Sequence, residues 1–251
     1  MAKIKIKIEK DQRQNASYES LSKERAAPSS QISSSSSNLS KLMKEAVHPE
    51  DHIPYTPFQE ALNCVSMCLP SILCAWYIHK STNNYEEIQW STWVLMFGTF
   101  VHLPFSVLYH GVCALGHDSE DLKRTDLSFI HITSCIYSYA LSASPLYLAA
   151  NIMVNARHIA AIWAKTGRHK AERSKNILFS VTLYLMPILF GGDTHNFIGT
   201  VAFFLAGGLC FQINLLGGYG HSIFHTIFIG FQYYLLQAAQ HVGRNGTVAC
   251  L

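Results

Sequence analysis

Long apolar segments separated by short polar loops make up most of the chain after residue 58. Each segment is close to the 20 or so apolar residues that an α-helix needs to cross a bilayer. Only 14% of all residues are charged, against about a quarter in soluble domains. The sequence therefore predicts an all-α integral membrane protein with a seven-transmembrane helix bundle. The predicted segments are 59–79, 92–115, 126–144, 145–164, 176–192, 197–215 and 219–241.

The first 45 residues differ in composition from the rest. They are rich in Ser, Lys, Gln and Glu, poor in aromatic residues, and contain the serine run Ser33 to Ser37. Such a segment buries too little apolar surface to fold alone, so residues 1–45 are predicted to form a disordered cytosolic tail. Residues 46–58 are a proline-rich segment leading into the first helix, 59–241 form the membrane domain, and 242–251 are a short C-terminal tail.

The distribution of cations predicts the orientation. The loop from Lys165 to Lys175 holds five cations and one acid, whereas the loops on the opposite side hold few cations. The positive-inside rule places this loop in the cytosol, so that with seven spans the N-terminus is cytosolic and the C-terminus is on the other side. The sequence does not indicate an organelle. A net charge of only +3 gives no indication of a nucleic-acid surface.

Five polar residues fall at helix ends that this topology places on the cytosolic side. Ser106 and His110 are one turn apart near the end of the second segment, and Asp126 opens the third. His221 and His225 open the seventh and share one helix face. Topology alone therefore predicts that the three histidines, the serine and the carboxylate lie at one depth.

These residue types are suited to zinc chemistry. Zinc binds neutral imidazoles, and three protein ligands leave a fourth position for water, which then ionises near neutral pH. His110, His221 and His225 are the predicted ligands of Zn²⁺, and Asp126 and Ser106 are the candidate catalytic residues. Alternatively, the histidines are interhelical hydrogen-bonding groups, and Asp126 caps its helix. His102 and His131, which lie deeper, are interpreted as packing residues or as part of a second polar site.

The combined pattern resembles the progestin and adipoQ receptor family and the related hemolysin III family, within a superfamily that includes alkaline ceramidases. Its signature is Ser-x-x-x-His in the second helix, Asp opening the third and His-x-x-x-His opening the seventh. Glu60, Asn63 and Ser66 are similar to the family's first-helix motif, although Met67 stands where the family usually has His. The resemblance covers about residues 58–241. It implies a seven-helix bundle, a three-histidine zinc site, and either ligand reception or lipid-amide hydrolysis.

Three functions stay open from the sequence. The first is zinc-dependent hydrolysis of a membrane lipid amide such as a ceramide. The second is a seven-helix receptor with a structural zinc, whose short non-cytosolic loops favour a small lipid or steroid ligand over a large protein. The third is a non-catalytic membrane protein. The hydrolase is the favoured chemistry, and its partner is a membrane lipid substrate or a small lipid ligand.

Overall fold

The computed structural model describes residues 55–164, 170–213 and 216–245, and within these residues the chain is helical, with no strand. The predicted tail, 1–45, lies outside the described residues. The helices form seven rods, of which the first is broken in two. They are α3 (Pro57–Met67) with α4 (Leu69–Asn83), α5 (Trp90–Ala114), α6 (Glu120–Ser142), α7 (Pro145–Trp163), α8 (Lys170–Phe190), α9 (Thr194–Gln212) and α10 (Gly220–Asn245). The predicted all-α class is thus confirmed.

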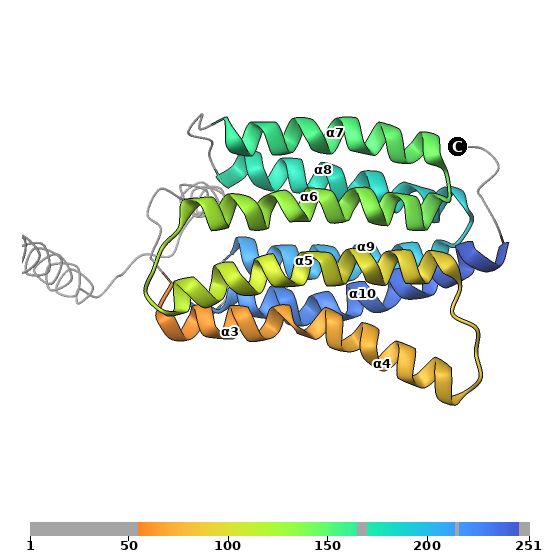
Figure 1. Cartoon of the computed structure of the whole chain (residues 1–251), viewed down its shortest axis with the longest axis horizontal. Coiled ribbons are helices and arrows are strands. Elements are labelled where there is room, and N and C mark those ends of the chain that lie inside the picture. The colour runs from red at the N-terminus through yellow and green to blue at the C-terminus, as the bar shows by residue number, and fades with distance from the viewer. Residues whose placement is uncertain (1–54, 165–169, 214–215, 246–251) are drawn as a thin grey trace, which may run out of the picture. The chain divides into compact units, whose positions relative to one another are not determined.

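The rods run alternately in opposite directions along one bundle (Figure 1). Helix α5 packs against α3, α6 and α10, while α7 and α8 both pack on α6 and α9 pairs with α10. Because of this alternation, the end of α5, the beginning of α6 and the beginning of α10 all lie at one end of the bundle. That arrangement brings together residues that are far apart in the sequence.

Two helices begin six residues earlier than the apolar segments predicted. Helix α6 begins at Glu120 rather than 126, with the Ser119 hydroxyl accepting from the backbone N–H of Leu122. Helix α8 begins at Lys170 rather than 176. The added turns are polar and therefore lay outside the apolar segments. A helix can continue past the apolar part of its sequence once a cap satisfies its first N–H groups. Asp126 therefore lies well inside α6, and the alternative that it caps this helix is wrong.

The first rod bends where α3 meets α4. Helix α3 starts with a capping box between Thr56 and Gln59, followed by Pro57 at a position where a proline N–H is not needed. Cys68 separates the two helices, and Pro70 stands in the first turn of α4. Proline removes one backbone donor and clashes with the preceding turn, which accounts for the change of direction in Figure 1.

The interior contains polar as well as apolar side chains. At mid-bundle, Tyr137 lies 2.8 Å from the Thr99 hydroxyl and donates to the Gln232 side-chain oxygen at 3.2 Å. Glycines allow close helix contacts, because a Cβ on Gly230 would lie 2.2 Å from the ring of Phe203. Close approach at small residues and interhelical hydrogen bonds are typical of membrane bundles.

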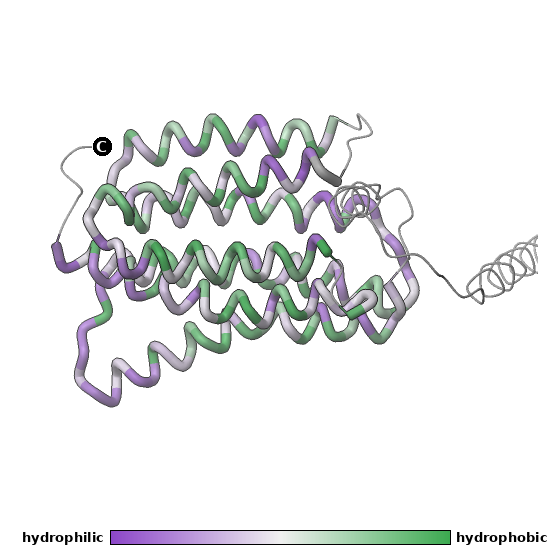
Figure 2. Tube along the Cα trace, turned by 180° about the vertical axis from the view of Figure 1, so that it is seen from behind, coloured by the Kyte–Doolittle hydropathy of each residue, from purple (hydrophilic) through white to green (hydrophobic). Residues whose placement is uncertain are grey.

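The outside of the bundle carries many large apolar side chains. Leu146, Met153 and Leu209 are more than 60% exposed, and exposed aromatic residues occur on most of the helices. Apolar residues run along the helices in Figure 2, whereas polar residues gather toward helix ends and loops. Within the described residues, three helical stretches are long and apolar enough to cross a membrane: Pro57–Asn83, Trp90–Ala114 and Thr194–Gln212. This supports a membrane protein, and the seven-span topology stays a prediction.

Candidate metal centre

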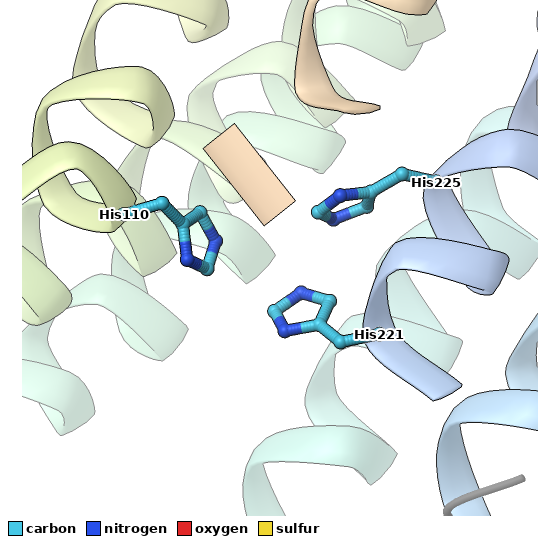
Figure 3. Close-up of side chains that lie close together, drawn as sticks. All are labelled: His110, His221 and His225. Carbon is cyan, nitrogen blue, oxygen red and sulfur yellow. The ribbon is translucent and has the colours of Figure 1, made fainter. Parts of the chain in front are cut away.

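Three histidines meet at one end of the bundle. The potential ligand atoms of His110, His221 and His225 all lie within 4.8 Å of one another. The three rings face a common centre in Figure 3, with His110 coming from α5 and the other two from α10. Ring centroids are 4.5 Å apart for His221 and His225 and 4.9 Å apart for His110 and His221. The predicted trio therefore forms a group that could hold one metal ion.

Local backbone structure explains why α10 presents its two histidines there. Gly217 and Gly218 both have positive φ, 63° and 108°, which lets the chain turn sharply before Gly220 begins the helix. The carbonyl of Gly217 accepts from the Gln59 side chain at 3.3 Å. The start of α10 is thereby tied to the start of α3, and the first two turns of α10 place His221 and His225 on one face.

Residues of α3 hold two of the imidazoles by their Nδ1 atoms. The His110 Nδ1–H donates to the Glu60 carboxylate at 2.7 Å. Ser66 lies 3.0 Å from His225 Nδ1, and its own proton is donated to the backbone carbonyl of Asn63. The hydroxyl of Ser66 must then accept from His225. Both rings are left with the Nε2 lone pair as their available ligand.

The side chain of Asn63 completes this support. It donates to the Glu60 carboxylate at 3.3 Å and accepts from Ser222 at 2.6 Å. Glu60, Asn63 and Ser66 are all buried on one face of α3. The sequence identified these three residues only by their resemblance to a family motif. Their hydrogen-bonding roles could not be predicted, because they depend on how α3 packs against α5 and α10.

The two candidate catalytic residues lie close to the trio. Ser106 is one turn from His110 and is 2% exposed, and its hydroxyl interacts with the Asp126 carboxylate. The main partner of Asp126 is His102, whose Nε2 lies 3.1 Å from the carboxylate oxygen. The sequence predicts His102 to be a packing residue or part of a second polar site, and the structure instead places it against Asp126 of the predicted site. It precedes Ser106 and His110 by one and two turns, so the three share a stripe of α5.

The donor set fits a zinc ion. Imidazole nitrogens are among the ligands that zinc prefers, and metal-binding histidines usually donate their other ring N–H to a carboxylate or another acceptor. His110 and His225 meet both conditions through Glu60 and Ser66.

Tyr55, just before α3, has its ring 6.0 Å from that of His221. Burial, followed by the nearby Glu60 carboxylate, raises the pKa of the Tyr55 phenol, so it stays neutral near pH 7.

The remaining deep histidine belongs to another cluster. His131 of α6 lies 2.8 Å from the Asn155 side-chain oxygen and 3.2 Å from the Ser180 hydroxyl. Both partners come from α7 and α8, so His131 takes no part in the three-histidine group.

None of the protein-family models, curated proteins or solved structures with which the chain was compared matches it. The geometry of the three-histidine group and the motif resemblance are therefore the basis for assigning a function.

Proposed function

We propose that the chain is a membrane-embedded zinc hydrolase that cleaves a lipid amide such as a ceramide. On the basis of its motif resemblance, we place it in the superfamily of the progestin and adipoQ receptor and hemolysin III families. The observation that carries the proposal is the convergence of His110, His221 and His225, two of them oriented through Nδ1. A zinc ion held by these three residues would supply Lewis-acid chemistry.

The surrounding residues have separate tasks in this proposal. Glu60 and Ser66 fix the tautomers of His110 and His225, so that both present a lone pair at Nε2. Asp126 is the proton acceptor for the attacking water and is held in place by His102. The Ser106 hydroxyl, next to Asp126, donates to the oxygen that gains charge as water adds to the amide carbon.

The reaction adds one water across the C–N bond and releases a carboxylic acid and an amine. The substrate class follows from the surroundings, because the bundle exposes apolar side chains along its length and a lipid reaches the site without leaving an apolar phase. In this proposal all seven rods cross the membrane, with the site at its cytosolic side.

One observation favours a second candidate, a receptor for a small lipid or steroid with a structural zinc. His110 and His225 are only 2% and 5% exposed, as in a closed metal site. His221 is only partly buried, however, and this leaves one open side.

Metal analysis and a ceramide hydrolysis assay on the purified chain test the proposal. We expect bound zinc in the wild type and a large loss of zinc for each His→Ala variant. Asp126→Asn should keep the metal and lose most of the hydrolysis. A chain without zinc would overturn the metal site. A chain with zinc but without hydrolysis of any lipid amide would favour the receptor.

Cobalt substitution separates the two candidates further. An open coordination position predicts that added azide changes the visible spectrum of the cobalt-loaded chain. An unchanged spectrum would mean that protein atoms fill the fourth position, and the structural role would then hold.

A further inference from the structure

A second polar site lies between α7 and α8, away from the three histidines. A cavity of about 410 Å³ opens there. Helices α7 and α8 lie side by side in Figure 1, each packed on α6. The lining includes two cations, one acid, two neutral polar residues and one aromatic ring: Arg157, Lys175, Glu172, His158, Asn176 and Phe179.

The two cations carry charge that the described part of the chain does not neutralise by an ion pair. Neither Arg157 nor Lys175 has a carboxylate within 4.0 Å among the described residues. Arg157 precedes the end of α7 at Trp163 by six residues, or about 9 Å, and Lys175 follows the start of α8 by about 8 Å. In a bilayer both would lie near the boundary between headgroups and hydrocarbon, where lipid phosphates are the available anions.

A network of buried hydrogen bonds supports the wall of the cavity. Ser180 donates to the Asn155 side-chain oxygen at 2.8 Å, and His131 donates to the same oxygen at 2.8 Å. With its proton used in this way, Ser180 accepts from the His158 Nδ1–H at 3.2 Å. Ser180 and Asn155 are fully buried and His131 is 2% exposed. The ring of His158 is therefore oriented before any ligand arrives, with the Nε2 lone pair as its unused group.

The lining specifies the chemistry of a ligand. Arg157, Lys175 and the amide of Asn176 donate hydrogen bonds and suit a phosphate, while Glu172 reduces the formal charge of the lining to +1. The His158 Nε2 lone pair accepts a hydrogen bond, which suits a headgroup hydroxyl. The Phe179 side chain, 51% exposed and with its ring 6.2 Å from that of His158, offers an apolar contact on the outer side of α8.

We propose that this cavity binds the headgroup of an anionic phospholipid, a singly charged phosphodiester carrying a hydroxyl, from the adjoining leaflet. The proposal rests on the membrane placement in the proposed function, and it is independent of the zinc. The bound lipid would bridge α7 and α8 at their connected ends and neutralise the two cations there.

Native mass spectrometry of the detergent-purified full-length chain tests the proposal. Dioleoylphosphatidylglycerol is compared with dioleoylphosphatidylcholine, which carries the same phosphodiester but no net charge and no hydroxyl. We expect one retained phosphatidylglycerol, bound at least tenfold more tightly than phosphatidylcholine. Arg157→Gln/Lys175→Gln should lose at least tenfold in that binding. His158→Phe should lose part of the preference for the hydroxyl-bearing headgroup.

A matched control removes the same charge from the same end of the bundle. Lys123→Gln/Arg124→Gln changes two cations of α6 that pair with Glu120 and do not line the cavity, so its lipid binding should equal that of the wild type. Equal losses in the two double variants would show general charge attraction and overturn the site. Thermal unfolding, measured on every variant, shows whether the bundle is folded whether or not it binds zinc, and zinc content measured beside it separates failure of this site from failure of the metal centre.

The source of the phosphate is tested with inorganic phosphate as a competitor. A lipid site predicts that millimolar phosphate leaves phosphatidylglycerol bound, because free phosphate lacks the apolar contact at Phe179. Displacement of the lipid by phosphate at equal concentration would overturn the lipid assignment.

Discussion

Replacing Glu60 by Gln tests whether the support from α3 sets the metal affinity. The Glu60 carboxylate is the buried partner of the His110 Nδ1–H at 2.7 Å, and the two side chains are 9% and 2% exposed. Glutamine has the same shape and keeps an acceptor oxygen but loses the charge. Removing a carboxylate behind a metal-binding histidine lowers metal affinity by about 10–100-fold. Because the acceptor survives, we expect the lower end, about tenfold or 1.4 kcal/mol, for Glu60→Gln and the upper end for Glu60→Ala.

The assay is competition for zinc between the purified chain and a chromophoric chelator. Glu87→Gln is the matched control, since Glu87 is exposed and precedes α5 at the other end of the bundle. His110→Ala gives the full loss for comparison. If His110→Ala loses zinc while Glu60→Gln and Glu87→Gln both bind it like the wild type, the carboxylate does not tune the site. The reasoning from the 2.7 Å contact would then be wrong.

Three further results are expected. Tyr137→Phe removes two buried interhelical hydrogen bonds and should lower the unfolding free energy by about 0.6–1.7 kcal/mol, measured by denaturant titration in detergent. Gly230→Ala should lower the melting temperature, because its new methyl meets an aromatic ring, whereas Gly208→Ala, with nothing within 4 Å, should not; equal behaviour would contradict the close packing. A glycosylation acceptor placed between 86 and 90 should be modified, and one placed in 165–175 should not, which the reverse pattern would refute.

The helices could largely be read from the sequence, and their ends could not. The apolar segments identified all seven rods because each is long and is bounded by polar residues, by glycines or, between 144 and 145, by a proline. The first turns of α6 and α8 are polar, however, so they lie outside the apolar segments and were not predicted as part of these helices. The break after Met67 depends on Pro70, and only the structure shows that α3 and α4 run in different directions on either side of the break. The number of spans and the orientation are still predictions.

The histidines of the site were predictable because spacing and topology determine them. His221 and His225 are four residues apart, and alternating helices bring the end of α5 to the start of α10. His102 could also have been found, since it is four residues before Ser106 on the same stripe. The bonds of Glu60 and Ser66 could not, because they require the rotation and depth of α3 relative to two other helices. The grouping of His131 with Ser180 depends in the same way on how α7 and α8 pack.

The three-histidine group joins an early helix to the last one. A chain made from its N-terminus places α5 in the membrane long before α10 has been synthesised. No intermediate that lacks α10 possesses more than one of the three ligands, so in the proposed function metal capture would come late in biogenesis and would mark the end of insertion. A molecule truncated before residue 221 would keep only His110 of the three ligands, and the proposed ion would then lack two of its protein ligands.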